Sequence, residues 1–205
     1  EESSRTWRRR CCEIIEGALR MTNQSAEELI QSSKEKIENQ DYINAIDDLT
    51  KAIDLDPKNA TAFVQRGRCK SYLKDMEGAI EDSSKAIEID PDFHGAFLTL
   101  GNAKNYLGDT TGAIDALSQA IKIFPENPFA YAMRGSIKYN SGNHQGAVDD
   151  YTNAIQIDPN NPINYKIRGF SKDELGDLKG ACEDWKKAAE LGNEEAAKLV
   201  EENCA

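Results

Sequence analysis

The chain has 205 residues, with 36 acidic against 25 basic side chains and a formal net charge of -11. It contains no run approaching the roughly 18 apolar residues of a membrane-spanning helix, and so acidic a surface repels phosphate backbones. We therefore expect neither a membrane span nor a nucleic-acid partner.

The hydrophobic fraction of 39% lies below the globular average of roughly 45–50%, which favours a thin, elongated fold. The five Cys form no CxxC pair, and two His add little from which to build a metal site. We expect no metal and no cofactor, and a cytoplasmic or organellar compartment with reduced thiols. The Cys are Cys11, Cys12, Cys69, Cys182 and Cys204.

Residues 1–25 form a predicted leader. Apolar side chains fall on one helical stripe between Trp7 and Met21, which favours a helix there. The basic cluster at residues 8–10 suggests either a membrane-surface or targeting helix, or a helix packed on the segment that follows; we favour the second. Ser25 and Glu28 have the spacing of a capping box, which predicts a new helix from residue 26.

A 34-residue repeat fills the chain after this leader. It contains an aromatic residue, a Gly four positions later, two Ala seven positions apart, and a Pro near the end. Five units can be written: 26–59, 60–93, 94–127, 128–161 and 162–195. The recurring residues include Gly67, Gly101, Gly135 and Gly169, then Ala45, Ala79, Ala113, Ala147 and Ala181, and Pro57, Pro91, Pro125 and Pro159.

Each unit is predicted to be a helix, a tight turn and a second helix. Small and apolar residues recur at helical spacing in both halves. Gly108, Gly142 and Gly176 supply the turn, because Gly adopts positive φ without penalty. The Pro ends the second helix, since it lacks an N–H and its ring clashes with the preceding turn.

This pattern resembles the tetratricopeptide repeat over residues 26–195. The resemblance implies an all-α, right-handed superhelix of five helical hairpins. The last unit departs from the pattern, because Gly192 and Asn193 replace the Pro, and the stretch from Lys187 to Ala197 is similar to the ends of Sel1-type repeats. Residues 196–205 are predicted to form a solvated capping helix, which an open-ended array requires.

Comparing the units with one another predicts an ion pair. An Arg precedes the Gly in three units, as Arg66, Arg134 and Arg168, and the same units carry an Asp sixteen residues later, as Asp82, Asp150 and Asp184. The third unit has Leu100 and Ala116 instead, so both charges are absent together. We infer that this Arg and Asp meet across the two helices, with bidentate geometry.

One Lys occupies the same position in every unit: Lys36, Lys70, Lys104, Lys138 and Lys172. A ligand-binding role is one interpretation. We favour a side chain whose stem covers the helix seam while its ammonium meets acids of the second helices. Those acids would be Asp47, Glu81, Asp115, Asp149 and Glu183.

In the family that the chain resembles, the first helices line a concave groove that receives a peptide or a segment of a partner. The resemblance implies these groove candidates: Gln65, Arg68, Tyr72, Leu98, Asn102, Tyr106, Phe129, Met133, Tyr139, Ile163, Ile167 and Phe170. Apolar members thicken toward the C-terminal half, and such clusters mark contact sites. Alternatively, Phe129, Ile163 and Phe170 only seal contacts between units.

Some members of the family hold the C-terminal carboxylate of a chaperone with Lys, Asn and Arg side chains on successive units. Here the best-placed Asn is Asn102, but Leu98 stands where the Lys belongs. The following units offer Met133, Ile163 and Ile167 in place of polar groups. We therefore expect no such clamp.

The C-terminus offers a possible disulfide. Cys182 lies ten residues before Gly192 and Cys204 twelve after it, so an antiparallel capping helix would place them at similar height. A disulfide there would imply an oxidising compartment and allow export.

We expect a non-catalytic scaffold or adaptor that binds a protein or peptide. The alternatives are an assembly factor or permanent subunit of a larger complex, and a self-associating solenoid. An enzyme is not supported, because His94 and His144 stand alone on different units and the sequence has neither a phosphate loop nor an HExxH motif.

Overall fold

The computed structural model describes residues 25–204, and all its regular elements there are helices. The helices are α2 (Ala26–Glu38), α3 (Tyr42–Leu55), α4 (Ala60–Tyr72), α5 (Met76–Ile89), α6 (His94–Tyr106), α7 (Thr110–Ile123), α8 (Pro128–Asn140), α9 (His144–Ile157), α10 (Pro162–Glu174), α11 (Leu178–Glu190) and α12 (Glu194–Asn203). The predicted all-α class is confirmed. The leader lies outside the described residues, apart from Ser25.

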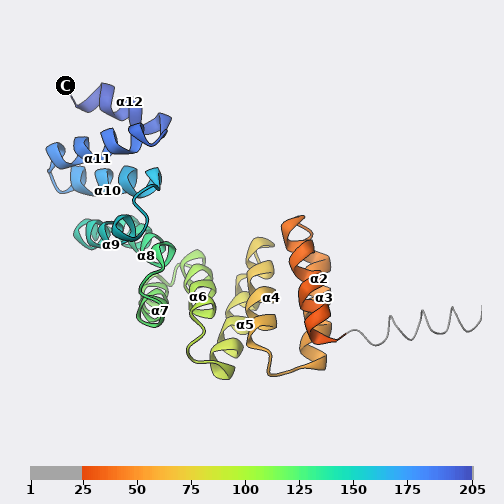
Figure 1. Cartoon of the computed structure of the whole chain (residues 1–205). Helices are drawn as coiled ribbons and strands as arrows, with labels where there is room; N and C mark the ends of the chain where they lie inside the picture. Colours follow the sequence, from red (N-terminus) through yellow and green to blue (C-terminus); the bar gives the residue numbers. More distant parts are fainter. Residues whose placement is uncertain (1–24, 205) are drawn as a thin grey trace, which may run out of the picture.

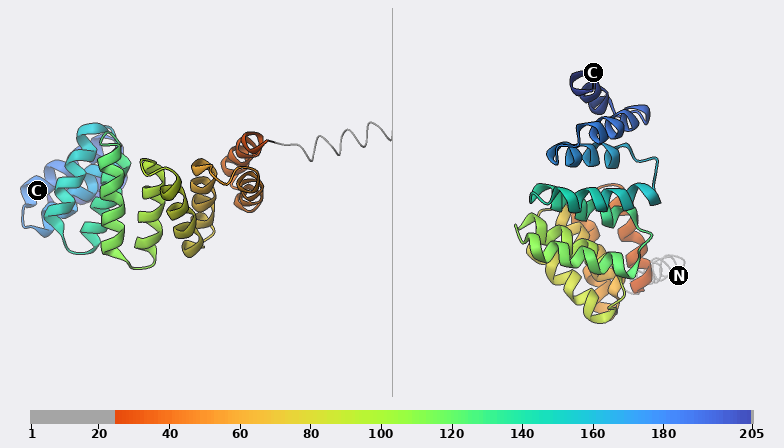
Figure 2. Two further views of the ribbon diagram at one scale, coloured as in Figure 1. Left: turned by 90° about the horizontal axis from the view of Figure 1, so that it is seen from below. Right: turned by 90° about the vertical axis from the view of Figure 1, so that its left-hand side faces the viewer.

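The helices pack as consecutive antiparallel pairs, from α2 with α3 to α10 with α11, and each pair contacts the next. The pairs stack in a row that turns along its length, which gives an elongated superhelix (Figures 1 and 2). The first helix of one pair also contacts the first helix of its neighbour, as α4 does α6. None of the helices from α2 to α12 has the length and apolar character needed to cross a membrane.

The ends of the helices follow the predicted signals. Ser25 and Glu28 form the capping box of α2. Gly108, Gly142 and Gly176 have φ between 80° and 85° in the turns inside their pairs, and Gln40 and Lys74 take the same left-handed conformation, with φ of 60° and 68°. This conformation costs roughly 1–2 kcal/mol for residues other than Gly.

The recurring Gly allows the two helices of a pair to approach closely. A Cβ on Gly169 would lie 2.5 Å from Nε1 of Trp185, and one on Gly101 would lie 2.8 Å from Cγ of Leu117. Trp185 and Leu117 are 1% and 0% exposed. A large second-helix residue therefore fills the space that the Gly leaves, and this packing forms the core of the pair.

The predicted Arg–Asp pair forms, and it is bidentate. Arg134 Nε and Nη2 donate to the two carboxylate oxygens of Asp150 at 2.9 and 2.6 Å, while Nη1 donates to Ser118 Oγ, on the second helix of the preceding pair, at 2.8 Å. Lys138 Nζ lies 2.9 Å from Asp150 Oδ2. The same set recurs as Arg66, Asp82, Thr50 and Lys70, and as Arg168, Asp184, Thr152 and Lys172.

The partner predicted for the recurring Lys was wrong. Where the Arg is present, the Lys pairs with the same buried Asp and not with the exposed acid beside it in sequence. The first pair lacks the Arg, and its buried carboxylate has other partners. Ser32 Oγ donates to Asp48 at 2.7 Å, and Lys36 pairs with the same carboxylate. Each buried Asp thus remains satisfied, as a low-dielectric site requires.

The third pair, α6 with α7, lacks this cluster. Leu100 and Ala116 replace the Arg and the Asp, and Lys104 reaches instead to the exposed Asp109, with its Nζ 3.4 Å from Oδ2. A shallow cavity of about 410 Å³ lies there, lined in part by Leu100, Lys104 and Ala116.

The capping helix α12 begins at Glu194, two residues before the predicted start. It packs on α11 through Leu199 and Val200, which lie against Trp185 and Cys182. Cys182 and Cys204 form a disulfide with Cα atoms 5.6 Å apart. The expectation that the chain's thiols are reduced is therefore wrong for this pair, whereas Cys69 is free and buried.

Candidate functional site

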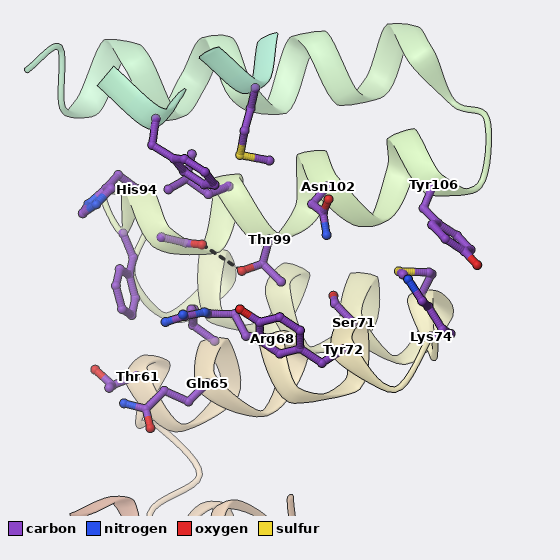
Figure 3. Close-up of a pocket in the computed structure, with 17 residues that line it drawn as sticks. Thr61, Gln65, Arg68, Ser71, Tyr72, Lys74, His94, Thr99, Asn102 and Tyr106 are labelled. Carbon is purple, nitrogen blue, oxygen red and sulfur yellow. Dashed lines mark hydrogen bonds between the residues drawn. The ribbon is translucent and has the colours of Figure 1, made fainter. Parts of the chain in front are cut away.

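A cavity of about 710 Å³ runs along the first helices α4, α6 and α8 (Figure 3). Among residues 25–204, its lining includes apolar, aromatic, polar and cationic side chains, and no Asp or Glu. The lining residues are Thr61, Val64, Gln65, Arg68, Ser71, Tyr72, Lys74, Met76, Phe93, His94, Gly95, Leu98, Thr99, Asn102, Tyr106, Phe129 and Met133. A cavity of this volume falls within the usual range for a ligand site.

The repeat explains how these side chains come together. Because α4 and α6 pack side by side in the same register, residues 34 apart face the cavity as pairs. The pairs are Val64 with Leu98, Gln65 with Thr99, Arg68 with Asn102, and Tyr72 with Tyr106. Phe129 and Met133 of α8 close the far side. Three of these repeat positions thus supply a different side chain on each helix, and the fourth supplies Tyr on both.

The cavity has an apolar floor and an aromatic rim. Val64 and Met76 are 5% and 2% exposed, whereas Phe129 and Tyr106 are 61% and 57% exposed. Large exposed aromatic rings next to a buried apolar floor provide the anchors found in protein interfaces.

Two contacts hold the rim in place. The ring of Tyr72 stacks on Tyr42, with centroids 4.6 Å apart and planes at 15°. Lys74 Nζ lies 5.0 Å from the centroid of the Tyr106 ring, within the range of a cation–π contact. Both contacts restrict side-chain freedom before any ligand binds, which lowers the entropy cost of binding.

Some polar side chains of the cavity form hydrogen bonds within the protein, and others remain free to bind a ligand. Thr99 Oγ1 donates to the Gly95 carbonyl at 3.1 Å (Figure 3), and the amide oxygen of Gln65 accepts from Ser33 at 3.2 Å. Within residues 25–204, the side chains of Arg68 and Asn102 form no hydrogen bond and no ion pair. Their donors are therefore free for a ligand.

Eight of the predicted groove residues line this cavity: Gln65, Arg68, Tyr72, Leu98, Asn102, Tyr106, Phe129 and Met133. The other four lie elsewhere along the array. Phe170 packs edge-on against Trp185 with centroids 5.6 Å apart, Tyr139 packs against His144 at 5.3 Å, and Ile163 is 52% exposed. Ile167 is half-buried on α10. The cavity therefore lies toward the N-terminal half, and not where the apolar candidates are most frequent.

The surroundings of Tyr139 differ from the cavity in charge. Burial raises the pKa of the Tyr139 hydroxyl, and the carboxylates of Glu174 and Asp173 raise it further. Acids thus lie near Tyr139, whereas none lines the cavity.

Lys74 and His94 line the cavity but are not among the groove residues predicted from the repeat. Lys74 occupies the turn position that holds Gly108, Gly142 and Gly176 in later pairs. A charged side chain at a position that favours Gly is the signal that could have identified it. His94 packs against Phe124 at the start of α6, with centroids 5.2 Å apart, and no sequence signal pointed to the cavity.

Models of the tetratricopeptide repeat match residues 29–59, 60–93 and 98–162. A search of curated proteins found no match. The matched ranges end at residue 162, so the Sel1-like end of the last repeat stays a prediction.

Several solved structures share the fold. A crystal structure of MamA has 27% sequence identity and a TM-score of 0.72, and the alignment covers 80% of this chain and 96% of that one. YrrB, described as a TPR protein with an unusual peptide-binding site, has 19% identity and a TM-score of 0.70, with 91% and 96% covered. MamA from Desulfovibrio magneticus RS-1 has 18% identity and a TM-score of 0.73, with 82% and 96% covered. The repeats, the paired helices and these matches show that the chain belongs to the tetratricopeptide repeat family.

Proposed function

We propose that this chain is a non-catalytic interaction scaffold, and that a peptide or an extended segment of a partner protein binds along α4, α6 and α8. The observation that carries the proposal is the open cavity of about 710 Å³ that spans three successive first helices. An elongated site across repeats suits an extended chain, because stacked repeats present continuous binding surfaces.

The chemistry of the lining supports a protein ligand. Tyr72, Tyr106 and Phe129 are exposed aromatic anchors, and Arg68 and Asn102 offer unused donors beside them. The description of YrrB as having a peptide-binding site concerns a protein with the same fold, so it supports this kind of use only in general terms.

A permanent subunit and a self-associating solenoid are the alternatives. Permanent interfaces are more apolar than transient ones. The cavity combines apolar groups with Arg68, Lys74 and Asn102. This mixed lining favours a transient adaptor over a constitutively filled subunit.

The Cys182–Cys204 disulfide supports an oxidising compartment as the place of action, because disulfides persist there and are rare in reducing ones.

Affinity capture followed by mass spectrometry tests the proposal. The bait would be the wild type, a variant with Phe129→Ala and Met133→Ala in the cavity, and a control with Ile43→Ala and Leu55→Ala, which are 70% and 59% exposed on α3. We expect one set of partners to be retained by the wild type and the control and lost by the cavity variant. Identical partners for all three proteins would contradict the proposal. Sedimentation of the wild type would detect self-association.

A further inference from the structure

We infer that the cavity along α4, α6 and α8 selects an acidic segment of a partner protein, in which Asp or Glu side chains flank an apolar residue. This inference rests on the proposed function and adds to it the chemistry of the ligand. Charge complementarity between the cationic lining of the cavity and an acidic ligand supports it.

The charge of the cavity opposes that of the whole chain. The sequence has 36 acids and a net charge of -11, yet the lining contains Arg68 and Lys74 and no carboxylate. A hollow with low-dielectric walls and one sign of charge focuses the field and attracts the opposite charge. The acids of the protein therefore do not prevent an acidic ligand from approaching at this place.

Among the residues that the structure describes, Arg68 differs from the other Arg residues of the repeats in having no partner. Arg66, Arg134 and Arg168 each form a bidentate pair with a buried Asp. Arg68, only two positions from Arg66, is exposed and forms no ion pair within residues 25–204. Its planar fork of donors matches the geometry of a carboxylate, and Asn102 lies at the equivalent position on the neighbouring helix to add an amide donor.

Lys74 places a second cation on the rim. Its Nζ rests above the Tyr106 ring and forms no ion pair among the described residues. A cation that is held by an aromatic face keeps its charge available, since the ring does not neutralise it. Two available cations on the same cavity favour a ligand with more than one carboxylate.

The apolar part of the lining determines which side chains we expect next to the acids of the ligand. Leu98, Phe129 and Met133 line the same cavity as Arg68 and Lys74 and are uncharged, and the thioether of Met133 adapts readily to an apolar side chain. We therefore expect an apolar or aromatic side chain next to the acids. The basic cluster at residues 8–10 of this chain has the wrong charge for the cavity.

Selection from a phage-displayed library of short random peptides tests the inference, since peptides fused to the coat protein have no free C-terminus. We expect peptides selected by the full-length wild type to be enriched in Asp and Glu next to apolar residues. Arg68→Glu should weaken binding of these peptides at least about tenfold. Lys122→Glu, an exposed charge reversal on α7, changes the net charge equally and should change affinity by less than about twofold.

A charge exchange makes the test specific. Replacing the acids of a selected peptide by Lys should abolish binding to the wild type and restore it to Arg68→Glu. Circular dichroism of each variant would verify folding, and Arg68→Gln provides a milder second variant. Arg68 is exposed and forms no ion pair with residues 25–204, so we expect neither substitution to alter the fold.

The outcomes separate this inference from the proposed function. Selected peptides that lack acids, or equal effects of Arg68→Glu and Lys122→Glu, would overturn the acidic ligand while leaving a peptide-binding cavity in place. If no peptide is selected, or binding survives Phe129→Ala with Met133→Ala, both the inference and the proposed function fail. If affinity capture with the wild type retains only a second copy of this chain, the chain self-associates, and the inference of an acidic partner segment is overturned.

Discussion

Replacing Arg134 by Ala should destabilise the array more than replacing Lys138 by Ala, although both residues contact the same carboxylate. The Arg134 and Lys138 side chains are 17% and 18% exposed, and that of Asp150 is 2% exposed. The two substitutions therefore remove similarly buried cations from one acid.

The geometry predicts different losses. Arg134 makes two charge-assisted bonds to Asp150 and one to Ser118 of the preceding pair. Breaking a buried pair costs about 3–5 kcal/mol, and we expect the lower end, about 3 kcal/mol, because Lys138 remains beside Asp150. Lys138→Ala leaves both guanidinium bonds intact and should cost about 1 kcal/mol. Lys104→Ala is an internal control, since its partner Asp109 is exposed, and should cost less than about 0.5 kcal/mol.

Urea unfolding followed by far-UV circular dichroism measures these losses. The Arg134→Ala, Asp150→Ala double variant should lose less than the sum of the two single variants, because the pair is already broken by either change. Equal losses for Arg134→Ala and Lys138→Ala would refute the reasoning, as would a large loss for Lys104→Ala.

Three further outcomes are expected. Cys182→Ser should lower the free energy of unfolding by about 3 kcal/mol, because the disulfide closes a loop with a sequence separation of 22. A reductant should lower the stability of the wild type by a similar amount. An unfolding midpoint that neither change alters would contradict this prediction. Burial raises the pKa of Cys69 to about 11, so peptide mapping after iodoacetamide treatment at pH 8 should find Cys69 unmodified in the folded protein and modified in urea; rapid labelling without urea would be contradictory. Burial by itself would raise the pKa of Asp48, but hydrogen bonds from Lys36 and Ser32 outweigh it and hold this pKa below 3.8. The folded state therefore resists protonation there, and stability present above about pH 4 is lost as the pH falls below that value. Asp48→Asn should reduce this acid sensitivity in thermal unfolding, and an identical pH profile would count against it.

The repeat in the sequence was sufficient for the helices, the turns and the Arg–Asp pairs. The Arg and the Asp occur together in three units and are absent together in the third unit, where Leu100 and Ala116 replace them. Such paired replacement within one sequence indicates that the two side chains contact each other. The partner of the recurring Lys was missed because the buried Asp and the exposed acid are neighbours in sequence. They differ by about 100° around the helix, and composition does not reveal which one faces the seam.

The position of the cavity depends on more than the repeat. The sequence indicates which residues of each first helix share a face, but the space between those faces depends on how successive pairs stack. Apolar residues become more frequent toward α10, yet Phe170 is taken up by packing on Trp185. Lys74 was missed because the turn signal at its position concerns only the backbone conformation and does not indicate where a Lys side chain reaches. The first pair has Ser32 in place of the Arg, and the sequence does not reveal that Ser32 and Lys36 together satisfy Asp48.

The central claim is that a partner segment binds along the first helices α4, α6 and α8. Amide chemical shifts of the isotope-labelled protein, recorded while a peptide from the library selection is added, test this claim most directly. We predict shift changes centred on Arg68, Asn102 and Phe129, with little change on α7, on α9 and on the part of α5 beyond Met76, which itself lines the cavity. Changes confined to those second helices, or spread evenly over the array, would contradict the account.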